Sequence, residues 1–528
     1  MIENKDGNRN KKAVKTVSMI IFATAFSKGL GLVRDMIMGN FYGGSAEYAA
    51  FATASRIPRD IFDIFLGAAI LGVFIPVYNS FNSNDINREK EKEEFANIFL
   101  NFVILATGLL ALLGMVFSRQ IINLITGYDE TTAKLAADLL RILFPMIVAA
   151  GAVYSLTGIL QSKGEFLAPA LVSAVSNSGV IIYFLFFNKY FKINGLAVAY
   201  LIAWIIQLLT LVIPLIRKNY KYKFIINLKN PAFIKSIKMS LPIMAGAWLV
   251  PFGMLIGQYF LSSLSRGEFY VSAFDYSTKI FLLITGILTY GICNYIFPTL
   301  AQNSEDNTEF VKIIKTGLSS ACFIIIPVAC LTYVLKGETV AVLFMRGEFS
   351  PELAKFTAEM FSVLAPSMLM FSVIEILNRA FYAKKLVKFP MIAALSGIAV
   401  NFGVCWFFIS ALKLAPVYIT FAILICQSAT AVILVIALKI NIKEIFDKRF
   451  LANIGKIVLS SGILLIIIKI LYYIINNNAF ELGFSHFIKN ITVAVIIVIV
   501  GICSYAGVNL IFGTDEAKAA VKMLKKDK

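Results

Sequence analysis

The sequence predicts an all-α polytopic membrane protein with about fourteen transmembrane helices, arranged as two parallel six-helix repeats and two further C-terminal helices. Three observations carry this prediction. Of the 528 residues, 59% are hydrophobic, more than a soluble core needs. Windows of about 20 mostly apolar residues, enough to cross a bilayer as a helix, recur along the chain. Similar residues also recur at a nearly constant offset.

The expected spans are these apolar windows, taken in order. The short segments on the side of the two termini hold about 31 Lys and Arg, against about 9 in the opposite loops. This bias predicts that both termini are cytoplasmic, and it accounts for the net charge of +18 without a nucleic-acid partner. The expected spans are 15–42, 46–80, 95–118, 133–160, 166–188, 194–216, 233–264, 270–300, 310–335, 352–382, 387–411, 416–438, 452–475 and 486–512.

Several classes of function are not expected. The basic segment 1–14 precedes a charged apolar stretch without a small-residue cleavage site, so a removable signal peptide is not expected. The six cysteines lack paired spacing, and the single histidine, His486, has no cysteine or carboxylate cluster near it. No nucleotide-binding loop is present. We therefore expect no disulfide framework, metal site, cofactor or enzymatic reaction.

A repeat joins the two parts of the chain. The run from Ala50 to Ile57 (AFATASRI) matches the run from Ala273 to Ile280 (AFDYSTKI) at an offset of 223, and matches at offsets of 221 and 222 follow downstream. Six crossings return the chain to its starting side, which predicts parallel repeats with the substrate path between them. A static scaffold or channel is the alternative. The expected parts are a tail (1–14), two lobes (15–218 and 219–440), two last spans (441–514) and a basic tail (515–528).

The first span carries charges that a lipid-facing helix would exclude. Lys28, Arg34 and Asp35 lie in it, and each such group costs roughly 2.5–3.5 kcal/mol at bilayer depth, so it usually faces a bundle interior or a wet cavity. Lys28 has no carboxylate within four positions, and Asp35 points about 100° away from Arg34 on a helix and need not bond to it. Gly29 and Gly31 mark a point where this span can bend, as do prolines in later spans (Pro58, Pro242 and Pro251).

Other buried charges have candidate partners one turn away. Arg56–Asp60, Arg59–Asp63, Asp275–Lys279 and Glu375–Arg379 have i,i+4 spacing, and Asp138–Arg141 has i,i+3 spacing, so each can form an internal ion pair. Structural ion pairing alone, without any substrate binding, is a sufficient explanation for the presence of these charges within the spans. The expected substrate-binding residues are Lys28, Arg34, Arg56, Arg59 and Lys279, with Asp35, Asp275, Glu375 and Arg379 in support.

A partly apolar, cationic path suits a substrate with an anionic head and a long hydrocarbon tail. Arginine can bind phosphate oxygens through two N–H groups, whereas lysine supplies a point charge. Because no ATP-binding motif is present, an ion gradient, the membrane potential or the substrate gradient would supply the energy.

Five segments together resemble the MurJ (MviN) family of lipid II flippases in the multidrug/oligosaccharidyl-lipid/polysaccharide (MOP) exporter superfamily. They are FSKGLGLVRDMIMGNFYG, GVFIPVYNSF, SAFDYSTKIFLLITGILTYGICNYIFPTLAQ, LFMRGEF (Leu343–Phe349) and LNRAFYAKKLVKFP (Leu377–Pro390). The resemblance covers roughly residues 15–440. It implies two six-helix lobes, two additional helices and a central cationic cavity for an undecaprenyl-pyrophosphate-linked glycopeptide, in the bacterial cytoplasmic membrane.

The resemblance also implies site residues. The family's essential arginines of the first and eighth spans map onto Lys28, Arg34 and Lys279, so two of the three positions hold lysine here. The second span departs from the family pattern, which has an Arg-Arg pair before Phe-Ala-Glu-Gly. This chain reads FDIFLG from Phe62. Arg59, about one turn earlier, is the candidate replacement.

Alternative functions remain within and outside this superfamily. They are export of another polyprenyl-linked glycan, cation-coupled multidrug export, and a non-transporting scaffold for a polysaccharide assembly complex. Anionic membrane lipids, near the basic clusters Arg217–Lys238 and Lys439–Lys456, and the cell-wall synthesis machinery are the other expected partners.

Overall fold

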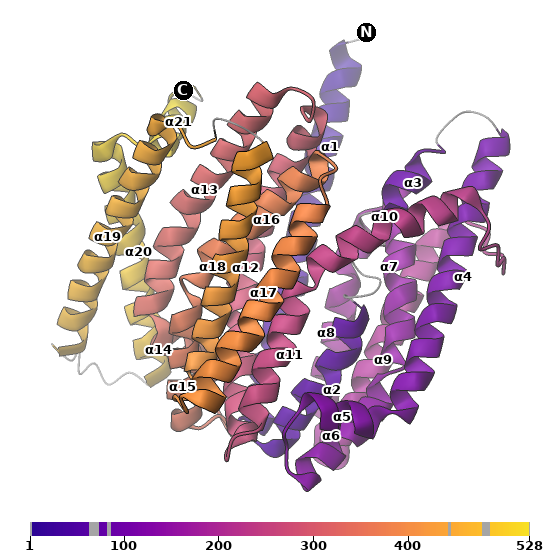
Figure 1. Cartoon of the computed structure of the whole chain (residues 1–528), viewed down its shortest axis with the longest axis horizontal. Helices are drawn as coiled ribbons and strands as arrows, with labels where there is room; N and C mark the ends of the chain where they lie inside the picture. Colours follow the sequence, from indigo (N-terminus) through magenta and orange to yellow (C-terminus); the bar gives the residue numbers. More distant parts are fainter. Residues whose placement is uncertain (1–2, 63–72, 82–85, 442–444, 478–485, 527–528) are drawn as a thin grey trace. The chain divides into compact units, whose positions relative to one another are not determined.

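All described elements of the chain are helices in the computed structural model (Figure 1), which describes residues 3–62, 73–81, 86–441, 445–477 and 486–526. Within these residues, nine helices are long and apolar enough to cross a membrane, or up to eleven if each of two bent helix pairs is one span. The chain is therefore an all-helical membrane protein, as predicted. The count of fourteen spans stays a prediction.

The chain divides into two units, Met1–Pro251 and Phe252–Lys528. Within the first unit, α1 packs along α8, α8 along α9, α4 against α7, and α2 against α6. The helices of this unit are α1 (Glu3–Tyr42), α2 (Ala46–Phe62), α3 (Ile75–Asn79), α4 (Ile86–Val116), α5 (Ser118–Ile125), α6 (Glu130–Leu143), α7 (Met146–Ser162), α8 (Leu167–Phe186), α9 (Asn188–Arg217) and α10 (Pro231–Ala247).

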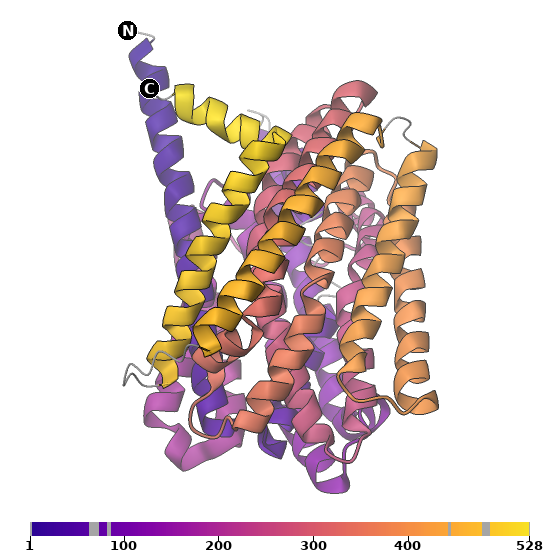
Figure 2. The ribbon, with the colours of Figure 1, turned by 90° about the vertical axis from the view of Figure 1, so that its left-hand side faces the viewer.

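In the second unit, α12 packs against α15 and α16, and α17 against α18. The last two long helices, α19 and α20, lie side by side against α13 and α14, and α21 follows the end of α20 (Figure 2). The helices are α11 (Leu249–Ser262), α12 (Gly267–Gln302), α13 (Asn307–Val334), α14 (Lys336–Phe344), α15 (Pro351–Leu364), α16 (Ser367–Ala383), α17 (Lys388–Cys405), the π-helix η3 (Trp406–Ala411), α18 (Tyr418–Asn441), α19 (Lys448–Asn477), α20 (His486–Phe512) and α21 (Asp515–Lys526).

Helix bounds in the second unit repeat those in the first. Both ends of α15 and of α16 match the corresponding ends of α6 and α7 at an offset of 221, and α12 and α17 begin at that same offset from α2 and α8. The pair α6 and α7 is bent by 42°, and the pair α15 and α16 by 45°. The two units are therefore built from one pattern of helices. The lobe boundaries predicted from the sequence stay a prediction.

Prolines mark the two equivalent bends. Pro145 lies between α6 and α7, and Pro366 lies between α15 and α16. Proline lacks an N–H and its ring clashes with the carbonyl four residues earlier, so a helix bends or ends there. By contrast, α1 runs as one helix through Gly29 and Gly31. The helix is therefore continuous at these glycines, whereas α10 and α11 are separated at Trp248.

The core of the first unit lies mainly between α3, α4 and α7. It contains buried aromatic rings, with the Phe74 ring centroid 5.5 Å from that of Phe95 and 4.9 Å from that of Phe99. Gly158 of α7 allows Phe74 to approach, because a Cβ at Gly158 would lie 2.9 Å from the Phe74 ring. This close packing makes α4 a fixed support for the segments that contact it.

Candidate functional site

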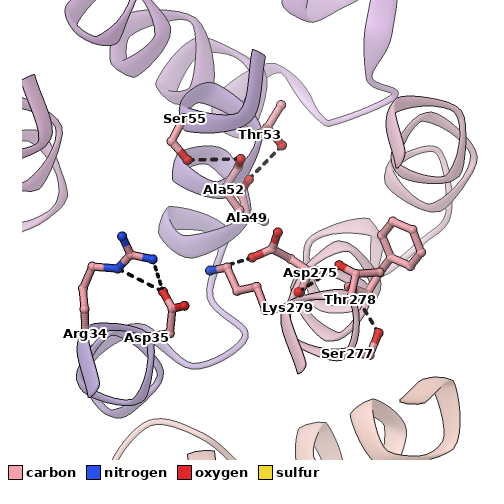
Figure 3. Close-up of polar contacts among 11 residues, drawn as sticks. Arg34, Asp35, Ala49, Ala52, Thr53, Ser55, Asp275, Ser277, Thr278 and Lys279 are labelled. Atoms are coloured by element: carbon pink, nitrogen blue, oxygen red, sulfur yellow. Dashed lines mark hydrogen bonds and ion pairs between the residues drawn. The ribbon is translucent and has the colours of Figure 1, made fainter. Parts of the chain in front are cut away.

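Arg34 on α1 contacts side chains from three helices. Its Nη2 lies 2.9 Å and its Nε 3.2 Å from Asp35 Oδ1 (Figure 3). Its Nη1 donates to Asn177 Oδ1 at 3.0 Å, and its guanidinium carbon lies 5.6 Å from the centroid of the Tyr200 ring. Helices α1, α8 and α9 therefore hold one guanidinium. Arg34 and Asp35 do bond, although neighbouring residues on a helix need not.

Asn177 links Arg34 to the backbone of its own helix. The Asn177 amide nitrogen donates to Ser27 O at 3.1 Å, while the amide oxygen accepts from Arg34. Gly31 allows this approach, because a Cβ there would lie 3.2 Å from the Asn177 amide nitrogen. The bond to Ser27 fixes which end of the amide faces the guanidinium, and so Asn177 positions Arg34.

The second unit contains the same helix contact without the cation. Asn401 of α17 donates to Gly253 O of α11 at 3.4 Å, and a Cβ at Gly253 would lie 3.0 Å from the Asn401 amide nitrogen. Gly253 matches Gly31 at an offset of 222, and Asn401 matches Asn177 at an offset of 224. At the offset that relates the two glycines, Ile256 takes the place of Arg34. The contact is thus common to both units, and the guanidinium is special to the first.

Lys28 differs from Arg34 in its surroundings. It is half-buried on α1, and within the part of the chain that the structure describes no carboxylate lies at ion-pair distance from its ammonium group. Because α1 is unbroken, Lys28 and Arg34 project about 120° apart around the helix axis. The structure therefore does not bring Lys28 to the contacts that hold Arg34.

The second-span cations occupy two environments on α2. Arg56 is buried, whereas the Arg59 side chain is 56% exposed and its Nε lies 3.7 Å from Asp60 Oδ1. Asp60 is buried. The predicted partner of Arg59, Asp63, lies outside the described residues, as does the rest of the departing FDIFLG motif after Phe62.

Lys279 forms the ion pair that its spacing predicts. Its ammonium lies 2.9 Å from Asp275 Oδ2 on α12 (Figure 3), and 5.6 Å from the centroid of the Tyr276 ring. The Asp275 side chain is 6% exposed and the Lys279 side chain 28%. The carboxylate is therefore the more buried partner, and the lysine side chain is the more exposed one.

Two further predicted pairs are present. Arg379 Nη1 donates to Glu375 Oε2 at 2.6 Å, and the guanidinium carbon lies 5.6 Å from the Tyr290 ring centroid. Arg141 Nη1 lies 3.8 Å from Asp138 Oδ1, with both side chains about half exposed. The first pair is half-buried and joins α12 to α16, whereas the second is an exposed pair of little energetic weight.

Sequence reasoning missed Asn177 and Tyr200. Both lie within apolar spans, where a polar amide is costly unless it finds a partner, so an isolated asparagine in the stretch Leu167–Phe186 was the available signal. Its partner could not be identified from spacing, because Arg34 and Asn177 are 143 residues apart.

Replacing Asn177 with leucine is expected to lower stability and transport together. The substitution removes the bonds to Ser27 O and Arg34, and a lost bond to a charged group costs about 1.5–3 kcal/mol. The matched variant Asn401→Leu removes the equivalent contact without a cation, so we expect it to lower stability but to reduce transport much less. Thermal unfolding of the purified proteins and a transport assay on both check this. Equal loss of transport in the two variants would contradict the positioning role.

Comparison with known proteins gives a consistent result. A family model described as "Lipid II flippase MurJ" matches residues 38–493. A protein of Bdellovibrio bacteriovorus named "Probable lipid II flippase MurJ" is 28% identical over 400 residues, covering 74% of this chain and 76% of the relative. A Thermotoga maritima protein of the same name is 26% identical over 394 residues, covering 74% and 78%.

Solved structures share the fold. One titled "Lipid II flippase MurJ, inward closed conformation" matches with a TM-score of 0.77 at 23% identity, covering 95% of this chain and 99% of that one. A multidrug resistance MATE family transporter of the MOP superfamily, in an inward-facing conformation, matches with a TM-score of 0.65 at 15% identity, covering 80% and 94%. These likenesses concern the fold of the helices.

Proposed function

The chain belongs to the lipid II flippase MurJ family, and we propose on that basis that it carries a lipid-linked peptidoglycan precursor from the inner to the outer leaflet of the cytoplasmic membrane. The precursor would be an undecaprenyl-pyrophosphate-linked glycopeptide, moved without covalent chemistry for cell-wall synthesis. Alternating access is the proposed mechanism. Related MATE transporters of this superfamily have been solved in conformations titled inward-facing and outward-facing.

The partly bound cations are the observation that supports an anionic headgroup. The bonds of Arg34 to Asp35 and Asn177 orient its guanidinium but use only part of its donor set, so N–H groups remain for phosphate oxygens. The Lys279 side chain is more exposed than that of its partner Asp275. We assign the same binding role to Lys28, Arg56 and Arg59. Asp35 supports Arg34 and Asp275 supports Lys279. The pair Glu375–Arg379 is proposed to support the site as well.

A cation-coupled multidrug exporter is less well supported by the same contacts. Such an exporter needs a carboxylate available to its cationic cargo, yet Asp35 and Asp275 are each bonded to a cation within their own helix. Export of another polyprenyl-linked glycan would use the same cations. Transport assays of the reconstituted protein with defined lipid-linked substrates distinguish export of another glycan from export of the peptidoglycan precursor.

We propose that both termini face the cytoplasm, because the segments on their side carry most of the Lys and Arg between spans. The substrate would then be taken from the leaflet on that side. A reporter that is active only in the cytoplasm should therefore be active when it is fused to either terminus. Anionic lipids and the cell-wall synthesis machinery are the other proposed partners.

Expression of this chain is expected to restore growth to a bacterium depleted of its own MurJ, because the family function is carried by the cations retained here. The measurement is colony formation under depletion, with membrane insertion checked by immunoblot. The control is a variant with Gln at positions 28, 34 and 279, which should insert but not restore growth. Normal growth with that control would instead favour a non-transporting scaffold.

A further inference from the structure

The segment between α9 and α10, residues 218–230, turns at both ends and has no helix or strand over 220–227. Two asparagines fasten it to α4. Tyr220 Oη donates to Asn97 Oδ1 at 2.9 Å, and Tyr222 Oη donates to Asn101 Oδ1 at 2.8 Å. Both asparagines are 1% exposed and lie one helical turn apart. They therefore fix the path of the segment along the side of α4.

The same asparagines satisfy the backbone of the segment. Asn97 accepts from Lys223 N at 3.0 Å and donates to Lys221 O at 3.2 Å. Asn101 donates to Lys223 O at 3.0 Å and to Ile225 O at 3.1 Å. Backbone without helix or strand is costly away from water unless its N–H and C=O groups have partners. Two buried amides supply such partners here.

The place of these contacts along α4 gives their depth in the membrane. The first turns of α4, Arg88–Glu94, are rich in charge, and the apolar part of the helix begins at Phe95. Asn97 and Asn101 lie in the first two turns of that apolar part. The segment also begins directly after Arg217, where α9, itself a candidate span, ends. It therefore lies at the boundary between headgroups and hydrocarbon.

One edge of the segment is an exposed row of apolar side chains. Ile225 packs against the core of the unit, whereas the residues on either side of it, 221–224 and 226–229, are exposed. The row consists of Tyr222, Phe224, Ile226 and Leu228, which are 55%, 68%, 53% and 53% exposed. Exposed basic residues flank this row, and they are Arg217, Lys218, Lys221, Lys223 and Lys229.

We propose that residues 220–229 form an interfacial anchor, with the apolar row inserted among the lipid chains and the lysines bound to anionic phospholipid headgroups. Apolar side chains and lysines side by side match the chemistry of that layer, in which amphipathic segments bury their apolar side. The identity of the leaflet rests on the proposed orientation of the chain and would be the cytoplasmic one. The anchor itself does not depend on what the protein transports.

Depth-dependent fluorescence quenching tests the insertion of the row. Phe224→Trp is made in a protein whose Trp204, Trp248 and Trp406 are replaced by phenylalanine, and Lys90→Trp, on the charged part of α4, is the control. In bilayers of phosphatidylcholine and phosphatidylglycerol, we expect brominated lipid chains to quench the fluorescence at position 224 and aqueous iodide to quench it at position 90. Quenching at position 224 by iodide and not by brominated chains would overturn the anchor.

Lipid selectivity tests the role of the lysines. The relative association of spin-labelled phosphatidylglycerol over phosphatidylcholine is measured for the reconstituted protein and for Lys221→Gln/Lys223→Gln. We expect the contribution of this site to fall by about fivefold per lysine removed, and Lys221→Arg/Lys223→Arg to retain it. An unchanged selectivity in the glutamine variant would refute headgroup binding. Both measurements use purified protein, so they are independent of whether the chain restores growth to a MurJ-depleted bacterium.

Discussion

Arg34→Ala is expected to abolish substrate transfer while the protein remains folded and inserted. Arg34 is the cation that three helices of the first unit hold in one orientation, through Asp35, Asn177 and Tyr200. Alanine removes the donors proposed to bind phosphate oxygens and leaves the helix intact, because alanine has the highest helix propensity. Growth under MurJ depletion and transfer of labelled substrate in liposomes measure the effect.

Two variants make the Arg34 result specific. Arg34→Lys keeps the charge but cannot bond Asp35 and Asn177 in the same planar arrangement, so it should retain only part of the transfer. Arg141→Ala removes an exposed cation with a distant partner and should leave transfer unchanged. Wild-type transfer by Arg34→Ala at equal protein amounts would show that Arg34 has a purely structural role.

Exchanging the charges of Asp275 and Lys279 is expected to preserve the ion pair and to eliminate transfer. In Asp275→Lys/Lys279→Asp the i,i+4 spacing is unchanged, but the cation moves back by one helical turn, about 6 Å. The cation is then attached at position 275, where the side chain is more buried, and the carboxylate is attached at position 279, where the side chain is more exposed. An anionic headgroup would meet repulsion where it now meets an ammonium. Substrate transfer and thermal unfolding are the two measurements.

The single variant Lys279→Ala separates pairing from position. It leaves Asp275 without its cation, at a cost of up to about 3–5 kcal/mol for a buried partner. The exchanged double variant should recover stability relative to this single variant and should not recover transfer. Recovery of both properties by the exchange would mean that the pair serves the fold alone, and Lys279 would lose its place in the site.

Local spacing predicted several contacts correctly. The pairs Asp275–Lys279 and Glu375–Arg379 follow from i,i+4 geometry on a helix, which depends on the backbone alone. The apolar windows likewise predicted the all-helical membrane fold, and the matched runs near Ala50 and Ala273 predicted the repeat that the helix bounds show. Features that depend on one helix, or that appear when the sequence is compared with itself, could therefore be predicted from the sequence.

Contacts between helices that are distant in sequence could not be predicted from the sequence. To predict the bond from Arg34 to Asn177, one must know that α1 and α8 come close together at Gly31. Neither stretch of sequence alone identifies the other as its partner. The bends at Pro145 and Pro366, where proline interrupts the helix, were not predicted. The roles of Lys28, Arg56 and Arg59 in binding remain predictions.

The neighbouring charges of Arg34 and Asp35 have a consequence for biosynthesis. Asn177 is made 143 residues after Arg34, so at 5–20 residues per second α1 waits about 7–30 seconds for this partner. During that interval Asp35, added immediately after Arg34, is the counter-charge already on the same helix. The adjacent pair therefore lets a helix with a buried cation enter the membrane before the helix that will finally hold it exists.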